Sequence, residues 1–348
     1  MKISRSEAET TRSEGFLSLS PAIIISMKVS VLIVTYNHEQ YIAQALDSAL
    51  MQETSFDYEI VVGEDNSTDS TRDIVAGFQE RFPDKVRLLP SAERLGMQRN
   101  YMRTWKACVG EYIAMLDGDD YWTSAHKLQK QVDFLDSHPE CAMCFHQGEI
   151  RHPEGESIVV PNRRLKSVFA TKDMFFRNDI PNCSVMYRHG LLDELPDGYQ
   201  DLSTLDWPMH MLIAQHGKMG YIDELMAVWR YHRKGEYSGR TRIERLLGSL
   251  GLYRYVAEHI SPEYRKMMRA GIARRYFLLM QEYDKHGDFE NAKRFERESL
   301  KLYPLNVELF AYKLKIVAIR SVPSLVESLR FLKKLSRKAL RSVRKGRE

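Results

Sequence analysis

The sequence predicts an α/β fold in which a mostly parallel sheet is covered by helices and followed by a helical C-terminal appendage. Two observations support this fold class. Short runs of β-branched and apolar residues alternate with segments of helical periodicity over the first 140 residues, as is typical of parallel sheets with helices on both faces. From about residue 240 onward the periodicity is helical and strand signals are few.

The strands and helices of the sheet can be placed in order along the chain. KVSVLIVTYN (28–37) is a strand, and the segment after it carries apolar side chains on one helical face. An apolar strand at 60–62 precedes a polar loop and a helix whose start is marked by Ser67, Asp69, Ser70 and Thr71. VRLLPS (86–91) is a third strand. The helix NYMRTWKACVG (100–110) leads into the fourth strand, and a helix over 126–140 ends near Pro139.

The rest of the chain divides into regions of different character. Residues 1–27 are predicted to be a disordered leader, unless translation begins at Met27. Residues 28–238 are predicted to form one domain, with a nucleotide-binding half (28–138) and a more irregular acceptor half (139–238). Residues 239–348 form the helical region. GDFENAKRFERESLKLYPLN within it resembles half of a tetratricopeptide unit. A single unit cannot bury its own apolar face, which favours a helical appendage over a repeat array.

Composition describes an ordinary globular protein of 348 residues, with 43% hydrophobic and 28% charged residues. The net charge of +4 gathers at the C-terminus, in a basic amphipathic helix beginning near residue 325. That helix either contacts an anionic membrane surface or packs on its own domain with a solvated basic face. No apolar run is long enough to span a bilayer. We expect a cytoplasmic protein. If the basic helix contacts an anionic membrane, the protein would also lie at the inner membrane face.

Cysteine usage adds little functional signal. Four cysteines are too few for a disulfide scaffold. CAMCFH has zinc-like spacing, but it lacks a second pair and reads as a buried strand, so core cysteines are favoured over ligands.

Polar side chains follow three of the predicted strands. Tyr36 and Asn37 follow the first, Glu64 and Asp65 the second, and Asp117 and Asp119 the fourth. Ligands bind beyond the carboxyl ends of strands in open sheets of this type, so these clusters are expected to converge on one crevice.

The segment Asp117-Gly118-Asp119 predicts a metal site. Alternate residues of an extended chain point the same way, so both carboxylates can face Mg²⁺ or Mn²⁺, and Gly118 lets the backbone approach a ligand. A solvated acidic turn is the alternative, because such a triplet is common by chance. The sequence contains neither a P-loop nor a dinucleotide fingerprint.

Four further residues are candidates with a structural alternative. Asp65 could accept a hydrogen bond from a nucleobase imide. Asp206, between apolar neighbours, suits a general base or a helix cap. Arg230 and His232 could bind phosphate or metal, although lone residues of these types are more often structural.

Four segments together resemble the inverting family-two nucleotide-sugar glycosyltransferases with a GT-A fold. They are VSVLIVTYNHEQYIAQALDSALMQ, YEIVVGEDNSTDST, GEYIAMLDGDDYW and LDWPMHMLIAQHGKMGYIDELMAVWRYH. The resemblance covers about residues 28–238. It departs from the family pattern at Glu64, where an Asp is usual, and at Trp229, where a Tyr is usual.

The resemblance implies a role for each matching residue. Asp65 would read the base of a UDP- or dTDP-sugar in a pocket lined by Thr35 and Tyr36, Asp119 would hold Mn²⁺ or Mg²⁺, and Asp206 would deprotonate the acceptor hydroxyl. The implied nucleotide-sugar-binding set is Thr35, Tyr36, Asn37, Asp65, Asn100, Asp117, Gly118 and Arg230. The implied metal set is Asp119, Asp117 and His232. The acceptor would be a surface glycan or glycolipid, and no nucleic acid is implied.

Two other functions compete with this one. A sugar nucleotidyltransferase also uses paired carboxylates with Mg²⁺, but it needs a basic, glycine-rich loop after the first strand, and TYNHEQ has no Gly, Lys or Arg. A non-catalytic scaffold with a relic α/β domain is opposed only by the intact acidic residues.

Overall fold

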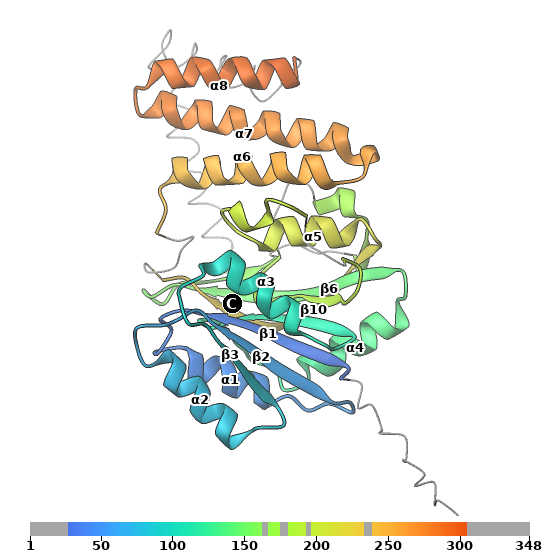
Figure 1. The fold of residues 1–348 in the computed structure, drawn as a ribbon. Helices are drawn as coiled ribbons and strands as arrows, with labels where there is room; N and C mark the ends of the chain where they lie inside the picture. Colours follow the sequence, from blue (N-terminus) through green and yellow to red (C-terminus); the bar gives the residue numbers. More distant parts are fainter. Residues whose placement is uncertain (1–26, 162–165, 175–179, 193–195, 233–238, 305–348) are drawn as a thin grey trace, which may run out of the picture.

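The fold is built around a single ten-stranded sheet (Figure 1). The structure is a computed structural model, and it describes residues 27–161, 166–174, 180–192, 196–232 and 239–304. The strands are β1 (Val29–Thr35), β2 (Tyr58–Glu64), β3 (Val86–Pro90), β4 (Tyr112–Asp117), β5 (Tyr121–Trp122), β6 (Cys141–Arg151), β7 (Ser157–Val160), β8 (Val168–Phe169), β9 (Met186–Arg188) and β10 (Lys218–Arg230). Their order across the sheet is β3-β2-β1-β4-β9-β6-β10-β5, with β7 on β6 and β8 on β10.

The four strands predicted from the first 120 residues form the parallel half of this sheet. β1 pairs in parallel with both β2 and β4, and β2 pairs in parallel with β3. The direction of winding reverses between β1 and β4, which is the topological switch point where open sheets bind ligands. β6 and β10 also pair in parallel, and the shorter strands join them in antiparallel fashion.

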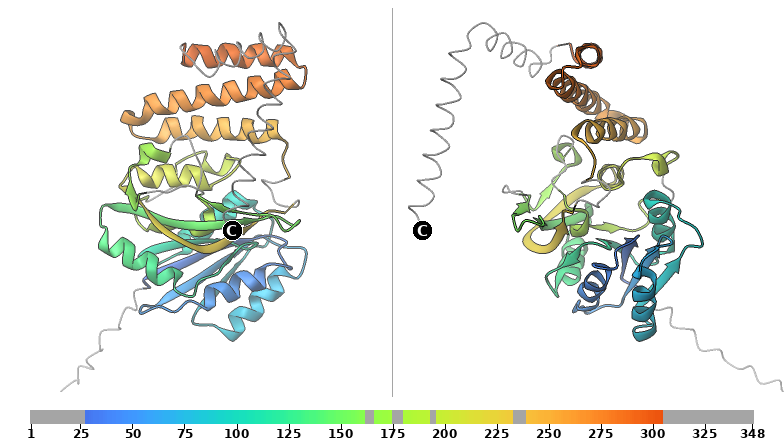
Figure 2. Two further views of the ribbon diagram at one scale, coloured as in Figure 1. Left: turned by 180° about the vertical axis from the view of Figure 1, so that it is seen from behind. Right: turned by 90° about the vertical axis from the view of Figure 1, so that its left-hand side faces the viewer.

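Eight α-helices are described: α1 (Ile42–Leu50), α2 (Thr71–Arg81), α3 (Met97–Ala107), α4 (Lys127–Ser137), α5 (Asp206–Ala214), α6 (Arg242–His259), α7 (Arg265–Lys285) and α8 (Phe289–Leu302). One face of the sheet is covered by α1, α2 and α4, and the other by α3 and α5 (Figures 1 and 2). The predicted helix–strand alternation is confirmed, with α3 ending at Ala107 rather than at Gly110.

The C-terminal helices stack in order on the α5 face, so that α6 lies on α5, α7 on α6 and α8 on α7 (Figure 1). They share one hydrophobic cluster with that face of the sheet, which includes Trp207 of α5, Tyr253 of α6 and Phe277 of α7. The helical character expected after residue 240 is confirmed over residues 242–302. Because its core is continuous with that of the sheet, this region packs as part of the α/β body.

One sequence-based expectation is wrong. Residues 141–238 are more regular than the sequence predicts, because they contain the two longest of the described strands, β6 and β10, which pair along most of their length. The buried strand predicted at CAMCFH is the start of β6, but the strand signal of β10 is obscured because β10 changes register at residues that interrupt its apolar pattern. Within the described residues, no helix combines the length and hydropathy needed to cross a membrane. The predicted leader and the basic helix near residue 325 lie outside the described residues.

All four cysteines are buried and free, as core cysteines would be. Burial raises the pKa of the Cys144 thiol to about 12, which keeps it protonated at neutral pH.

Candidate active site

The carboxyl ends of β1, β2 and β4 lie side by side, as the sequence predicted. Thr35 is in register with Glu64 on β2, and Val34 with Asp117 on β4. Regular parallel pairing places the residues that follow each strand at one edge of the sheet. The three polar clusters therefore meet because their strands end together.

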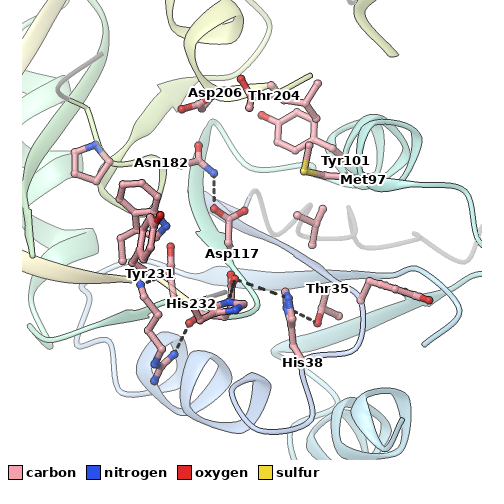
Figure 3. A pocket seen from close by; sticks show the side chains of 18 of the residues that line it. Thr35, His38, Met97, Tyr101, Asp117, Asn182, Thr204, Asp206, Tyr231 and His232 are labelled. Carbon is pink, nitrogen blue, oxygen red and sulfur yellow. Dashed lines mark hydrogen bonds and ion pairs between the residues drawn. The ribbon is translucent and has the colours of Figure 1, made fainter. Parts of the chain in front are cut away.

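A cavity of about 1100 Å³ opens at this edge. It is large for a ligand pocket, for which about 300–1,000 Å³ is usual. Ten of the eleven predicted site residues line it: Thr35, Tyr36, Asn37, Asp65, Asn100, Asp117, Asp119, Asp206, Arg230 and His232. Figure 3 shows Asp117 between Asp206 on one side and His38 and His232 on the other.

Gly118 is the predicted residue that does not line the cavity. A side chain at this position would meet the Thr35 hydroxyl oxygen at 2.7 Å and the His38 ring at 2.9 Å. Its glycine is therefore required by packing between the β4 end and the β1 loop, rather than by the approach of a ligand as expected.

Asp119 lies between two histidines. Its Oδ2 is 2.9 Å from Nε2 of His232 and 3.8 Å from Nε2 of His38. Burial by itself would raise the pKa of Asp119, but the hydrogen bond from His232 and the charges of both histidines lower it below its ordinary value. Asp119 is therefore an ionised carboxylate in a recessed position.

Asp117 has the opposite electrostatic environment. Burial and the nearby charge of Asp119 raise its pKa to about 7, although Asn182 donates a hydrogen bond to its Oδ2 at 2.9 Å. Two adjacent carboxylates with such different pKa values mark an unfavourable concentration of negative charge. A bound cation would relieve it.

The third acid of the segment is structural. Asp120 is 1% exposed, and its Oδ1 accepts a hydrogen bond from the backbone N–H of Arg230 at 2.9 Å. The Arg230 side chain also donates to the Asp119 carbonyl oxygen and to Gln44. These contacts hold the end of β10 against the Asp117–Asp120 turn. Because His232 follows β10 directly, the same contacts bring it next to Asp119.

Asp65 is 2% exposed and holds the loop before α3. Its two carboxylate oxygens accept hydrogen bonds from the backbone N–H groups of Leu95 at 2.7 Å and Gly96 at 3.0 Å. Each oxygen has further acceptor capacity, so a base-reading role remains compatible with this geometry. Arg94 of the same loop lies over the Tyr36 ring, 4.0 Å from its centroid.

Glu64, the departure from the family pattern, is completely buried and is not among the residues that line the cavity. Its Oε2 accepts from Arg72 at 2.6 Å and its Oε1 from the Ser67 backbone N–H at 2.5 Å. Asn66, between Glu64 and Ser67, has a positive φ of 58°, a backbone conformation that asparagine tolerates in turns. Glu64 thus stabilises the loop that carries Asp65.

Asp206 is the first residue of α5 and lines the cavity opposite the metal-binding candidates. The cap position is occupied by Leu205, so Asp206 does not cap the helix. The positive end of the helix dipole favours a carboxylate there. Trp207 packs beside it, 4% exposed.

Several lining residues were missed in the sequence. His38 directly follows the predicted cluster at Tyr36 and Asn37 and could have been included on that ground. Asn182 and the arginines Arg240, Arg245 and Arg275 gave no motif, because only long-range packing brings them to the cavity.

The donor set fits a divalent metal only in part. Asp119 and His232 are already within hydrogen-bonding distance, and Mn²⁺ or Mg²⁺ needs only one or two protein ligands when phosphate oxygens complete its shell. In the part of the chain that the structure describes, no group of three or more His, Cys, Asp or Glu side chains is arranged to hold an ion by itself. Any metal here would share its shell with a ligand.

Comparisons with known proteins agree with this arrangement. Residues 30–193 match the family model described as glycosyl transferase family 2. The uncharacterized protein Rv1520 of Mycobacterium tuberculosis is 34% identical over 209 residues, which is 60% of each chain, so the match spans about 60% of that relative's length. The dTDP-rhamnosyl transferase RfbG of Shigella flexneri is 27% identical over 233 residues, covering 63% of this chain and 78% of RfbG.

Solved structures share the fold at low sequence identity. Residues 1–349 of S. aureus TarS, solved with UDP-GlcNAc, align with a TM-score of 0.52 at 17% identity, covering 79% of this chain and 92% of that one. The mannosyltransferase PcManGT from Pyrobaculum calidifontis, solved with GDP-Man and Mn²⁺, aligns with a TM-score of 0.54 at 18% identity, covering 84% and 81%. Residues 30–193 are therefore similar to glycosyl transferase family 2, and the structure has the GT-A fold of these neighbours.

Proposed function

We propose that the protein is a metal-dependent inverting glycosyltransferase that moves a sugar from a UDP- or dTDP-sugar to a hydroxyl of a surface glycan or glycolipid. The observation that carries this proposal is that one cavity is lined both by the strand-end carboxylates Asp117 and Asp119 and by Asp206. A donor and an acceptor can thus be held in one space.

The donor end of the cavity offers groups for each part of a nucleotide sugar. Asp65 and the ring of Tyr36 would contact the base of the donor, and Asp117 would contact its ribose. Asp119 and His232 would hold the divalent ion, which when bound would neutralise charge on the leaving diphosphate. Arg230 lies next to this pair and adds a positive charge toward the same group.

Asp206 is proposed as the general base. It would accept the proton of the acceptor hydroxyl while that oxygen attacks the anomeric carbon and the diphosphate leaves from the other side. Attack opposite the leaving group inverts the configuration in one step. Holding both reactants in line supplies much of the rate enhancement.

The relatives support the donor class. RfbG is named a dTDP-rhamnosyl transferase, and TarS and PcManGT were solved with UDP-GlcNAc and with GDP-Man and Mn²⁺. The first two use the uracil or thymine bases expected here, whose imide N–H can donate to Asp65.

The test is a thermal-shift panel of UDP, dTDP, GDP and CDP, with and without Mn²⁺. We expect a shift of several degrees for UDP or dTDP that requires Mn²⁺ and is lost in Asp119→Asn. Glu53→Gln, an exposed acid away from the cavity, is the matched control and should keep the shift. An absence of any nucleotide-dependent shift in the wild type would contradict the proposal.

Asp206→Asn separates binding from chemistry. It should keep the nucleotide shift while donor turnover in the presence of acceptor falls at least about a hundredfold. Loss of the nucleotide shift in this variant would remove Asp206 as the base and place it among the donor contacts.

Peripheral contact with an anionic membrane is also proposed, from the sequence near residue 325 alone. Full-length protein should sediment with anionic liposomes, and a variant lacking residues 323–348 should not.

A further inference from the structure

The ring of Tyr41 contacts three side chains at the donor end of the cavity. It stacks on the His232 ring, with centroids 5.3 Å apart and an interplanar angle of 28°. It meets the His38 ring edge-on, with centroids 6.4 Å apart, and the Arg230 guanidinium carbon lies 5.2 Å from its centroid. Tyr41 also lines the cavity. One aromatic ring therefore joins both histidines beside Asp119 to the neighbouring arginine.

The turn before α1 places Tyr41 at this point. The backbone N–H groups of Tyr41 and Ile42 both donate to the His38 carbonyl oxygen at 2.9 Å, so the chain turns directly from the β1 loop into the helix. Gln44, three residues after Tyr41, lies on the same side of α1. The Arg230 side chain, beside the Tyr41 ring, donates a hydrogen bond to Gln44. The start of α1 thus contacts the end of β10.

Helix α1 gives the Tyr41 ring a fixed support. Ile42, Ala45 and Leu46 are completely buried in the core on that face of the sheet. Stacked rings and a cation near a ring face are favourable arrangements with defined geometry. A ring held in this way limits the positions that the His232 imidazole can take.

The orientation of His232 matters because its ring must face Asp119 to share an ion with it. Nε2 of His232 lies 2.9 Å from Oδ2 of Asp119. Residues that orient a metal-binding histidine contribute to metal affinity although they do not touch the ion. Tyr41 can act in this way through its stack on the His232 ring.

We propose that Tyr41 is a positioning residue of the transferase, which holds the His232 imidazole toward the divalent ion. This inference rests on the proposed transferase function and adds to the site a residue from the start of the first helix. A flat aromatic side chain is required at position 41, whereas the tyrosine hydroxyl is not.

The test is Mn²⁺ binding to the full-length protein in the presence of UDP and of dTDP, measured by electron paramagnetic resonance. Tyr41→Leu should weaken Mn²⁺ binding by about fivefold or more, because the stack on His232 is lost. Tyr41→Phe keeps the ring and should bind Mn²⁺ within about twofold of wild type. Equal binding by Tyr41→Leu and wild type, or a loss in Tyr41→Phe as large as in Tyr41→Leu, would overturn the inference.

A double-mutant cycle separates positioning of His232 from a general structural effect. If Tyr41 acts through His232, adding Tyr41→Leu to His232→Ala should weaken Mn²⁺ binding by no more than about twofold further. Losses that multiply independently would overturn the inference. Tyr41→Met, which keeps the side chain long and apolar but has no ring, repeats the cycle if Tyr41→Leu lowers the thermal midpoint.

Tyr121→Leu is the matched control. Tyr121 also lies beside the Arg230 guanidinium, 4.4 Å from its ring centroid, but it belongs to β5 and does not line the cavity. Its loss should change Mn²⁺ affinity by less than about twofold. A loss as large as that of Tyr41→Leu would attribute the effect to loosening of the end of β10, against the inference.

Failure of this inference can be told apart from failure of the proposed function. Wild-type protein that binds no Mn²⁺ with either nucleotide would refute the metal-dependent transferase function, and the role of Tyr41 with it. Nucleotide-dependent Mn²⁺ binding that is unchanged in Tyr41→Leu would refute only the role of Tyr41.

Discussion

Replacing Lys127 with methionine is expected to stabilise the protein. Lys127 begins α4 but is completely buried, and its ammonium group has no hydrogen-bond partner among the described residues. It lies 3.8 Å from the ring centroid of Trp122. Burial lowers its pKa from 10.5 to about 7, with the nearby Cys144 and Cys183 thiols opposing the shift.

The size of the effect follows from this pKa. A lowering of about 3.5 units corresponds to about 5 kcal/mol against the charged form. The cation–π contact with Trp122 offsets about 2 kcal/mol. Methionine retains most of the apolar stem, so Lys127→Met should raise the free energy of unfolding by about 3 kcal/mol at pH 7.

The gain should depend on pH in a defined direction. Between pH 7 and 10.5 the unfolded chain binds a proton at Lys127 that the folded chain has lost, so wild-type stability rises with pH through this group. The advantage of Lys127→Met should therefore shrink as the pH rises from 7 toward 10, by at most about 1.4 kcal/mol per pH unit.

Urea denaturation of both proteins at pH 6.5, 7.5, 8.5 and 9.5 measures this difference. Lys130→Met is the control: Lys130 lies on the same helix but is partly exposed and paired with Glu224, and its loss should change stability by less than about 1 kcal/mol. A Lys127→Met variant less stable than wild type at every pH, or a gain unchanged across the range, would refute the reasoning.

Three further changes probe the proposed active site. Asn182→Ala removes the hydrogen bond that lowers the pKa of Asp117, so Asp117 should be more protonated at pH 7. Titration calorimetry should show nucleotide affinity with Mn²⁺ falling by about threefold to tenfold at pH 7 and recovering at pH 8.5. Gly118→Ala places a Cβ 2.7 Å from the Thr35 hydroxyl and should lower the free energy of unfolding by about 1–3 kcal/mol in urea titrations. His232→Ala should weaken Mn²⁺ binding in the presence of UDP by about tenfold or more, measured by electron paramagnetic resonance, and unchanged affinity would remove His232 from the metal site.

The sequence by itself determined the framework of this protein and one side of its cavity. Alternation of apolar strands with amphipathic helices predicted the parallel half of the sheet. Because parallel strands end at one edge, the residues after β1, β2 and β4 could be placed together from their sequence positions alone, and Tyr36, Asn37, Asp65, Asp117 and Asp119 line the cavity. Asn100, Asp206, Arg230 and His232 line it too, but only the family resemblance assigned them to the same site. Local pattern is sufficient where neighbouring strands have a regular register.

Only the tertiary structure decided what each polar group contacts. Gly118 is required because a side chain there would meet Thr35. Asp120 accepts a hydrogen bond from the backbone of Arg230, and Glu64 accepts one from the Arg72 side chain. Thr35 and Arg230 are distant from their partners in the sequence, and Arg72 belongs to the helix after the Glu64 loop, so no spacing rule connects these groups.

The arginines that line the cavity near α6 and α7 are the clearest case. Arg240, Arg245 and Arg275 follow the strand-end motifs by more than a hundred residues and carry no motif of their own. They reach the cavity because the stack of Trp207 and Tyr253 fixes α6 and α7 against α5. Helical periodicity predicts that a helix exists and which face is apolar, but the packing of that face decides which charges it brings to a site.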